Sequence, residues 1–318
     1  MLAHVLISKS NMKTCPFFGV CGGCKYDFAA PEYREKKLAA LRDLPVTDSP
    51  RWVDAGTRRR GDFCFAGNVF GLFESRSKNI VPVRNCPNMV PEINDILPRV
   101  AALPWGAAGS CLITACENGI DIVINSNVPY YTPEFKAAAA GVGAIRVVWN
   151  DKIVFQSEKP IIKFGDVAVE YPAGAFLQPG KMGEGILREM VVAATAGARR
   201  VADLFCGLGN FTFATGADGF DIVGTGVKRD LFTHPLTVGM LNTYDCVIMD
   251  PPRAGAMAQC RELVKSNVGR VIYVSCNPET FHRDMEILTR GGYQLRDLIP
   301  VDQFVGSTHW ELFSVFEK

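Results

Sequence analysis

Hydrophobic residues are spaced in two different ways along the chain. Between residues 61 and 170 they form short runs, such as 119–124, separated by glycine, proline and asparagine, which is typical of antiparallel strands. Helical spacing interrupts these runs at 91–103 and 133–140, and a short polar helix is predicted ahead of them at 32–44. This part of the chain is therefore predicted to be a β-rich α+β region.

After Gly180 the spacing changes to an alternation of buried strands and helices. The predicted elements are a helix at 182–196, strands at 200–205, 244–249, 270–274 and 310–316, and helices at 256–266 and 278–290. Such alternation indicates a mostly parallel sheet covered on both faces. The fold class is therefore predicted to be α/β, with a first domain at 1–170 and a second at 171–318.

Composition agrees with two packed domains, because the chain has 318 residues and is 48% hydrophobic. No apolar run approaches the ~20 residues that a membrane span needs, and residues 1–7 lack the basic start and long apolar stretch of a secretion signal. Eleven cysteines without such a signal argue against a disulfide framework. We therefore expect a soluble, cytoplasmic protein with no membrane partner, whose clustered cysteines bind metal or serve catalysis.

Charge is unevenly distributed. The net charge is only +1, but residues 1–100 carry 15 Lys/Arg against 10 Asp/Glu, which leaves the remainder at −4. This asymmetry permits a polyanion to bind the first part of the chain. An ordinary solvated surface explains it equally well.

A glycine turn follows the predicted strand at 200–205, where residues 203–210 read DLFCGLGN. Gly207 and Gly209 let the backbone turn tightly and approach a ligand closely. An acid at the strand end, Asp203, and an aromatic ring in the turn, Phe205, suit S-adenosylmethionine, which offers an ammonium group and ribose hydroxyls. A turn with nothing bound is the alternative, since many strand–helix connections contain G-x-G.

Two reactive side chains follow two successive buried strands. Asp250 begins the segment DPPR after one strand, and Cys276 lies in SCNP after the next. Open α/β sheets build active sites at the carboxyl ends of their strands. A thiolate can add to an electron-poor ring that a nearby carboxylate orients. Taken singly, Cys276 fits an inert core cysteine and Asp250 fits a turn cap, but the pair favours an active site.

These segments together resemble the family of RNA uracil-5 methyltransferases, which modify transfer RNA and large-subunit ribosomal RNA. The resemblance covers residues 171–318 well and implies a Rossmann-like, S-adenosylmethionine-dependent methyltransferase domain. DPPR also resembles the tetrad of amino-group DNA methyltransferases, but those use an aromatic residue after the prolines and no cysteine. The matching segments are DLFCGLGNFTF at 203–213, DPPRAG at 250–255, SCNP at 275–278, HWE at 309–311, and FLQ at 176–178 as the counterpart of the family's FxQxN element.

The resemblance implies a covalent mechanism on a base that is flipped out or unpaired. Cys276 would add to C6 of uracil so that C5 can attack the methyl group, Glu311 would remove the C5 proton, and Asp250 would hold the uracil edge, with Arg253 steadying the loop. The alternative for Glu311 is the exposed face of a terminal strand. The implied cofactor-binding residues are Gln178, Asp203, Phe205, Gly207, Gly209, Asp230 and Asp250.

Three cysteines lie close together in the first 30 residues, which otherwise have the composition of a loop. Cys15, Cys21 and Cys24 follow the pattern C-x5-C-x2-C, and Cys86 is a distant fourth. Zinc and an iron–sulfur cluster both accept such thiolates. The CPxFxxCGGC pattern resembles the ligands of a [4Fe–4S] cluster in the ribosomal-RNA branch of the family, and this resemblance favours the cluster and ribosomal RNA.

RNA contacts are expected between residues 25 and 170. Only 14 residues precede Cys15, so we expect no oligonucleotide-binding barrel ahead of the cysteines. A solvated run of charge is the alternative for the basic residues of this region. The candidates for phosphate contacts are Arg58, Arg59, Arg60, Arg76 and Lys78, near the aromatic rings of Phe63, Phe70 and Phe73.

The cofactor side departs from the family pattern. Asp203 and Asp250 are only 47 positions apart, where two strand–helix units normally lie. Asp230 resembles the later acid near the adenine, so the second strand with its terminal acid, and the helix after it, are predicted to be missing. Gly180 replaces the asparagine of FxQxN. Both losses weaken the case for cofactor binding.

The sequence thus predicts a monomeric, cluster-bearing RNA uracil-5 methyltransferase that acts on 23S rRNA. Two rivals remain. An RNA-binding relative with impaired catalysis and weak cofactor binding is favoured by the short segment 204–249. A transfer-RNA uracil-5 methyltransferase differs only in the RNA that it modifies.

Overall fold

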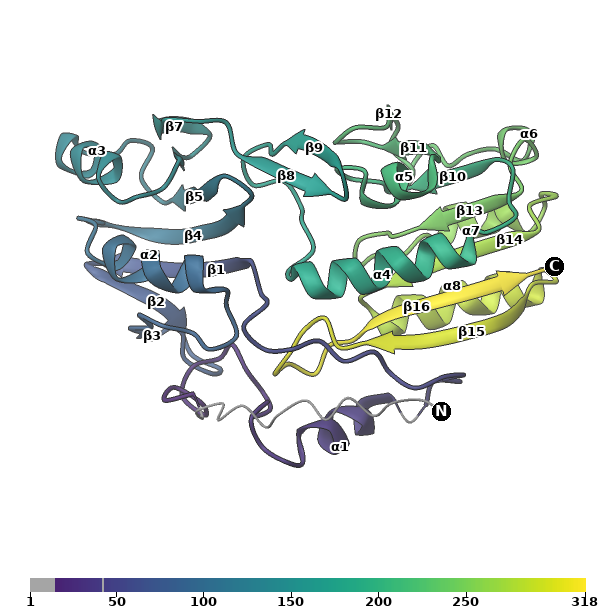
Figure 1. The fold of residues 1–318 in the computed structure, drawn as a ribbon, viewed down its shortest axis with the longest axis horizontal. Coiled ribbons are helices and arrows are strands. Elements are labelled where there is room, and N and C mark those ends of the chain that lie inside the picture. Colours follow the sequence, from purple (N-terminus) through teal and green to yellow (C-terminus); the bar gives the residue numbers. More distant parts are fainter. Residues whose placement is uncertain (1–14, 42) are drawn as a thin grey trace.

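The computed structural model describes residues 15–41 and 43–318, and it is built on two seven-stranded sheets with a two-stranded hairpin between them. In Figure 1 the sheet of the first half lies on the left and the sheet of the second half on the right. The prediction of a missing secretion signal concerns residues 1–7, which lie outside the described residues. Among the residues described, no helix is long and apolar enough to cross a membrane.

The first sheet is mainly antiparallel, in the order β3-β2-β1-β4-β5-β6-β7. Only β5 and β6 pair in parallel within it. The predicted β-rich α+β region is therefore confirmed. Its strands are β1 (Arg60–Gly67), β2 (Val69–Phe73), β3 (Ile80–Val81), β4 (Ala107–Cys116), β5 (Gly119–Ser126), β6 (Arg146–Trp149) and β7 (Lys152–Gln156).

Two helices, α2 (Pro91–Ala101) and α3 (Pro133–Ala140), pack on this sheet over buried aromatic rings. Each begins with a proline, which suits a first turn whose N–H needs no helical partner. Thr132 caps α3 by accepting a backbone N–H at 3.1 Å. Phe65 and Trp105 stack with ring centroids 4.2 Å apart, and such aromatic rings pack among the aliphatic side chains of this core.

The second sheet has the order β12-β11-β10-β13-β14-β16-β15. Its first five strands are parallel to one another, and β16 runs antiparallel to both of its neighbours, β14 and β15. This arrangement confirms the predicted Rossmann-like sheet. Its strands are β10 (Val201–Leu204), β11 (Asp218–Asp221), β12 (Val227–Lys228), β13 (Cys246–Met249), β14 (Arg270–Ser275), β15 (Gln294–Val301) and β16 (Glu311–Glu317).

Helices cover both faces of the second sheet because successive strand residues point to opposite sides. On one face, α4 (Lys181–Ala194) and α5 (Asn210–Thr215) pack against the alternate strand residues that include Ile248 and Ile272. On the other, α6 (Val238–Leu241), α7 (Met257–Leu263) and α8 (Pro278–Arg290) pack against the intervening ones. Strand β15 was not predicted from the sequence, because charged residues and Pro300 interrupt its pattern; as an edge strand it tolerates proline.

The prediction that the second parallel strand is missing is wrong. Strand β11 lies parallel to β10, and β12 lies parallel to β11 (Figure 1). Parallel neighbours normally need a crossover of a dozen or more residues, whereas here residues 222–226 make the whole connection. The predicted loss of the helix is correct for this segment, since no helix lies between the two strands.

Residues 33–53 belong to the first half of the sequence but pack on the second sheet. Helix α1 (Tyr33–Leu38) and a short 3₁₀ turn, η1 (Ala39–Leu41), lie where a helix at 32–44 was predicted, and Tyr33 and Leu41 enter the second core. Lys37 is fully buried and pairs with Asp302, which also accepts the hydroxyl of Tyr33 at 2.7 Å. The two-stranded hairpin between the sheets, β8 (Ile161–Phe164) and β9 (Val167–Glu170), packs beside the glycine turn at Leu208.

The buried pair of Lys37 and Asp302 generates a stability prediction. Replacing Lys37 by methionine leaves the Asp302 carboxyl buried without its cation, so the free energy of unfolding should fall by about 3–5 kcal/mol. The matched control is Lys36→Met on the same helix. Lys36 pairs with Glu32 at a site where its side chain is 57% exposed, so this substitution should lower the free energy of unfolding by at most ~1 kcal/mol. Urea denaturation of both variants measures the difference; equal losses would contradict the assignment.

Candidate active site

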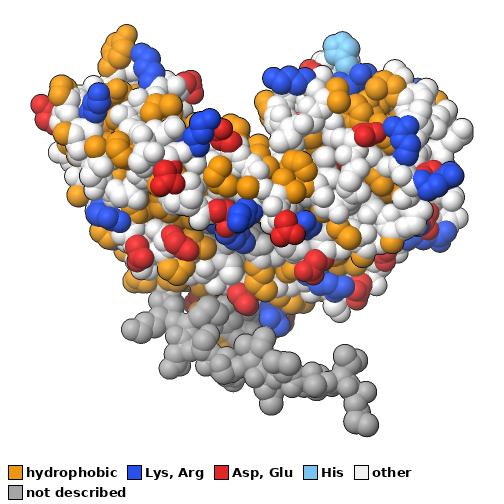
Figure 2. All heavy atoms as spheres, turned by 45° about the horizontal axis from the view of Figure 1, so that its top comes forward, with side chains coloured by type: hydrophobic (Ala, Val, Ile, Leu, Met, Phe, Trp, Pro, Cys, Tyr) orange, Lys and Arg blue, Asp and Glu red, His pale blue; other side chains and the backbone are white. Residues whose placement is uncertain are grey.

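A cleft of about 1230 Å³ separates the two sheets. Figure 2 shows the hollow between the two halves of the molecule. Arg58 and Arg60 line it from the first half, and Asp250, Cys276 and Glu311 line it from the second. The predicted catalytic side chains therefore face one shared space.

The topology of the second sheet brings these side chains together. Asp250 and Cys276 directly follow the parallel strands β13 and β14, so both emerge at the carboxyl edge of the sheet. Glu311 begins β16, which runs antiparallel to β14 with Leu312 opposite Ser275. Because β16 is reversed, its first residue lies at the edge where β14 ends.

A polar loop holds Cys276 at the wall of the cleft. Asn277 caps α8 by accepting the N–H of Glu279, and its amide donates to the carbonyl of Arg253 at 2.9 Å. The segments SCNP and DPPR are thus tied to each other. Burial, with the charges of Glu311 and Asp250, raises the pKa of the Cys276 thiol to about 11, and Arg253 opposes this rise.

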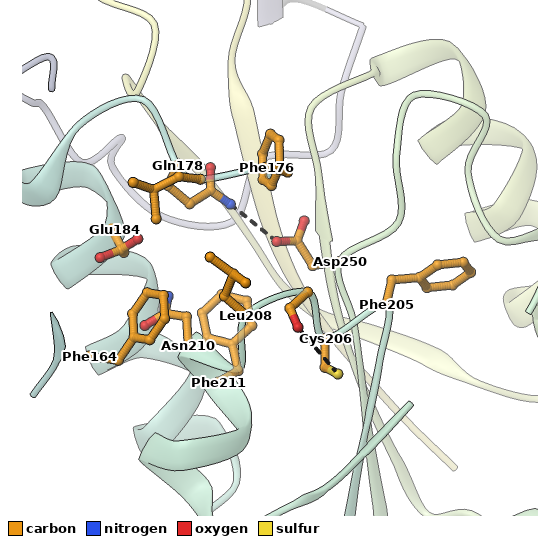
Figure 3. Close-up of a pocket in the computed structure, with 12 residues that line it drawn as sticks. Phe164, Phe176, Gln178, Glu184, Phe205, Cys206, Leu208, Asn210, Phe211 and Asp250 are labelled. Carbon is orange, nitrogen blue, oxygen red and sulfur yellow. Dashed lines mark hydrogen bonds between the residues drawn. The ribbon is translucent and has the colours of Figure 1, made fainter. Parts of the chain in front are cut away.

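Two side-chain amides link the two carboxyl groups. Gln178 donates from Nε2 to Asp250 Oδ2 at 3.1 Å, as the dashed line in Figure 3 marks. Gln303 donates from Nε2 to Gln178 Oε1 at 2.6 Å and to Glu311 Oε2 at 3.1 Å. Gln178 was predicted from the FxQxN resemblance; Gln303 was missed because no motif marks it.

Both carboxyl groups resist ionisation. Burial raises the pKa of Asp250 to about 7, and the charge of Asp203 adds to that rise. Burial raises the pKa of Glu311 well above its ordinary value, and Asp250 raises it further, while the hydrogen bond from Gln303 opposes the rise. Neighbouring carboxyl groups with raised pKa values are a feature of sites that move protons near neutral pH.

The glycine turn is tight, as the sequence predicted. Phe205, Gly207 and Gly209 all have positive φ, at 63°, 52° and 93°. A Cβ on Gly224 would lie 1.8 Å from the carbonyl oxygen of Gly207, so only glycine allows this approach of the two loops. Asp221 fixes the turn by accepting the N–H of Gly207 at 2.9 Å.

Asp221 is the acid at the end of the second parallel strand, and the sequence analysis missed it. It ends β11 and lines the cleft. The sequence analysis predicted no second strand in this segment, whereas the structure has β11 at residues 218–221 and β12 at residues 227–228. The acid predicted to be absent is therefore present at Asp221.

A small recess of about 60 Å³ opens between the glycine turn, Gln178 and Asp250 (Figure 3). Asn210 lines it, and neither polar atom of the Asn210 amide has a hydrogen-bond partner among the described residues. A buried amide without partners is costly, which indicates space reserved for a polar ligand. The sequence signal was the last residue of DLFCGLGN, which we did not single out.

Of the remaining residues predicted to bind the cofactor, two line the cleft and Asp203 does not. Phe205 and Asp230 line the cleft, with Phe232 next to them and its ring centroid 5.4 Å from that of Phe205. Hydrogen bonds from Thr233 lower the pKa of the Asp230 carboxyl. Asp203 is fully buried beneath the turn, where it accepts the hydroxyl of Thr212 at 2.6 Å, and it lines neither the cleft nor the recess.

Only two of the five cations predicted to contact phosphate line the cleft. Arg58 and Arg60 line the cleft. Arg59 is 1% exposed and bonds to Glu184 at 2.5 Å, so it is a core residue and cannot meet phosphate. The predicted aromatic partners Phe63 and Phe70 are also buried. The exposed residues Arg76, Lys78 and Phe73 lie at the β2–β3 turn, outside the cleft lining.

The four N-terminal cysteine positions occupy one region. Burial raises the pKa of Cys24 to about 12, and Cys86, Cys21 and Cys15 each add to that rise. Cys24 also contacts Gly306, where an added Cβ would lie 2.8 Å from its sulfur. Within residues 15–41 and 43–318, no three His, Cys, Asp or Glu side chains are grouped in a way that could hold a metal ion.

Comparison with known proteins decides the family. An RNA methyltransferase of Agrobacterium fabrum, itself uncharacterized, is 34% identical across 94% of this chain and 83% of its own length. One of Mesorhizobium japonicum is 33% identical across 96% of this chain and 84% of its own length. A family profile described as tRNA (uracil-5-)-methyltransferase matches residues 232–318. This chain belongs to the RNA uracil-5 methyltransferase family.

The fold agrees with this assignment. The tRNA (uracil-54, C5)-methyltransferase of Pyrococcus abyssi, solved with S-adenosyl-L-homocysteine, superposes with a TM-score of 0.70 at 18% identity, covering 90% of this chain and 82% of that one. The predicted Rossmann-like fold of S-adenosylmethionine-dependent methyltransferases is confirmed. Together with the relatives at 33–34% identity, this makes the chain an enzyme, an RNA methyltransferase.

The burial of Asp203 generates a pH prediction. Burial raises its pKa to about 7, against ~4 in the unfolded chain. The folded state thus holds a proton that the unfolded state has lost, and the Asp203 contribution to stability should fall as pH rises from about 4 to about 7. Replacing Asp203 by asparagine removes this contribution. Between pH 5 and 8 the free energy of unfolding should therefore fall more for the wild type than for Asp203→Asn; parallel curves from urea titrations would refute the shift.

Proposed function

We propose that this enzyme methylates C5 of uracil in RNA through a covalent bond between Cys276 and C6 of the base. The observation that carries the proposal is the convergence of Cys276, Asp250 and Glu311 on one cleft. A thiol beside two carboxyl groups with raised pKa values has both the nucleophile and the proton acceptor that this reaction needs.

The proposed steps assign one task to each side chain. Once the Cys276 thiol has lost its proton to water, its sulfur gives an electron pair to C6, and the C5–C6 double-bond electrons move toward the ring carbonyl. Bound S-adenosylmethionine would supply the methyl group that C5 takes up, and S-adenosylhomocysteine would be the leaving group. Glu311 then removes the proton from C5, the C5–C6 double bond re-forms, and the thiolate leaves. Asp250 orients the base edge, and the cation of Arg253 opposes the rise in the thiol pKa.

The residues around the glycine turn fit the proposed cofactor. The unpartnered amide of Asn210 and the close backbone approach at Gly207 and Gly224 form a polar recess. Asp221 and Asp230 line the adjoining part of the cleft and match the two acceptors expected for ribose and adenine groups. Gln178, Phe205, Gly207, Gly209 and Asp250 complete the proposed binding set.

The rival function is an RNA-binding relative that binds the cofactor poorly. One observation favours it: the connection of residues 222–226 replaces a whole helix beside the proposed adenosine site, and Ile222 and Val223 are left 60% and 64% exposed. Calorimetric titration with S-adenosylmethionine separates the two functions. Heat of binding at micromolar to millimolar cofactor supports the enzyme, and none at millimolar cofactor supports the rival.

We further propose that residues 1–170 form the cluster-bearing and RNA-binding domain and that residues 171–318 form the catalytic domain. The RNA would enter the cleft between the two sheets, where Arg58 and Arg60 offer cations and Arg60 lies over the Phe176 ring at 5.9 Å. The CPxFxxCGGC resemblance favours 23S rRNA over transfer RNA. This choice is tested by measuring methyl transfer from labelled cofactor to purified rRNA and to purified tRNA.

The four cysteines Cys15, Cys21, Cys24 and Cys86 are proposed to hold a [4Fe–4S] cluster, which accepts one thiolate on each iron. Their mutual effect on pKa supports a common location. The thiol of Cys21 already accepts the N–H of Gly23 at 3.3 Å, a hydrogen bond that would favour its charged form.

The covalent step generates a trapping prediction. RNA that contains 5-fluorouridine at the target position has no C5 proton for Glu311 to remove, so the enzyme should stay bonded to it. Cys276→Ala should abolish both the adduct and methyl transfer. The matched control is Cys246→Ala, a fully buried strand cysteine away from the cleft, which should form the adduct normally. A denaturing gel detects the adduct, and its persistence in Cys276→Ala would refute the nucleophile.

The cluster proposal predicts metal content. Protein purified without oxygen should contain iron and acid-labile sulfide, and Cys24→Ser should lose both. Cys116→Ser is the matched control, because Cys116 is a partly buried cysteine elsewhere in the first half and should leave the iron content unchanged. Elemental analysis decides the case, and zinc without sulfide in the wild type would overturn the cluster.

A further inference from the structure

The side chain of Gln303 joins two parts of the proposed site that come from distant segments. Gln303 lies in the loop between β15 and β16, eight positions before Glu311. Its single amide nitrogen donates both to Glu311 on β16 and to Gln178 ahead of α4, 125 positions away in the sequence. Gln178 in turn donates to Asp250. A continuous path of hydrogen bonds therefore runs from one carboxyl group to the other.

The Gln303 side chain is buried with only part of its amide hydrogen-bonded. The side chain is 5% exposed, and its Oε1 atom has no hydrogen-bond partner among the described residues. An unpartnered buried oxygen opposes folding. The orientation of the amide is therefore set by the two acceptors on its nitrogen, Gln178 Oε1 and Glu311 Oε2.

A glycine on α4 provides the room for this arrangement. A Cβ on Gly183 would lie 2.6 Å from Gln303 Oε1 and 3.2 Å from its Cγ. Glycine in a helix interior is unfavourable relative to alanine, so Gly183 has a local reason to be there. Gly185, two positions along the same helix, has open space at its Cβ.

We propose that Gln303 is a positioning residue for methyl transfer, and that its amide holds the Glu311 carboxylate and the Gln178 amide in one fixed arrangement at the cleft. The inference rests on the proposed function, because it assigns Glu311 the removal of the C5 proton. Gln303 itself lines neither the cleft nor the recess.

The predicted effect is a change in proton affinity as well as in rate. An N–H donor favours the charged form of a carboxyl group, so loss of the Gln303 amide shifts the protonation of Glu311 to higher pH. The groups that face Glu311 are Asp250 and Cys276 at the strand ends and Arg253 in the DPPR loop, with His309 also at the cleft wall. On the α4 side the neighbouring charges, Glu184 and Arg59, neutralise each other. None of these groups changes in a Gln303 variant.

The test compares three variants with the wild type. Gln303→Met keeps the side-chain length and removes the amide. Gly183→Ala keeps Gln303 but pushes on its amide, and Gly185→Ala makes the same chemical change where nothing is displaced. The measurement is kcat and KM for labelled methyl transfer to RNA across pH 5 to 9, with thermal unfolding as the check on folding.

We expect Gln303→Met to lower kcat at least about tenfold, the loss that follows from removing a hydrogen bond to a charged group, and to move the acidic limb of the kcat profile to higher pH. KM for the cofactor should change much less. Gly183→Ala should show the same two effects to a smaller degree, and Gly185→Ala neither. If Gln303→Met does not fold, the comparison of Gly183→Ala with Gly185→Ala tests the positioning role.

Identical profiles for Gly183→Ala and Gly185→Ala, or a rate loss in Gln303→Met without a shifted limb, would overturn the positioning role. A wild type that methylates no uracil would instead count against the proposed function. In that case the infrared band of the protonated Glu311 carboxyl, identified by its loss in Glu311→Gln, is followed against pH. A band that titrates alike in wild type and Gln303→Met overturns the inference, and a titration displaced to higher pH in Gln303→Met supports it.

Discussion

Two carboxyl groups, Asp250 and Glu311, share a buried site, and the charge of Asp250 makes Glu311 harder to ionise. Burying like charges together is costly, so the protein must arrange donors around them. Gln178 and Gln303 supply these donors without adding charge. This uncharged bridge joins the two acids that the chemistry proposed for Cys276 requires.

Most of the fold could be predicted from the sequence, because the pattern of buried runs is strong in both halves. The parallel strands of the second sheet, their helices and the strand-end positions of Asp250 and Cys276 follow from that pattern. Strand β11 could not be found in this way, since Asp218, Gly219 and Asp221 make three of its four residues atypical of a buried strand. Only its pairing with β10 identifies it.

The candidate site was predictable where short segments carry it and unpredictable where the tertiary structure carries it. Cys276, Asp250 and Glu311 lie in recognisable segments, whereas Gln303 acquires its contacts from a loop and a helix far apart in the sequence. For Arg59 a short sequence pattern led to a wrong prediction. A run of three arginines suggests an exposed surface, yet alternation along an extended segment turns the middle one into the core, where Glu184 pairs with it.

The buried pair of Lys37 and Asp302 constrains the order of events during synthesis. The two residues are 265 positions apart, and Gly306 in the same loop accepts backbone N–H groups from Lys25 and Tyr26. The cysteine-bearing segment therefore leaves the ribosome well before the loop on which it docks. At about 5–20 residues per second, this segment must wait many seconds in an undocked state before the loop that receives it exists. Lys37 therefore has no buried partner until strands β10 to β15 have been made.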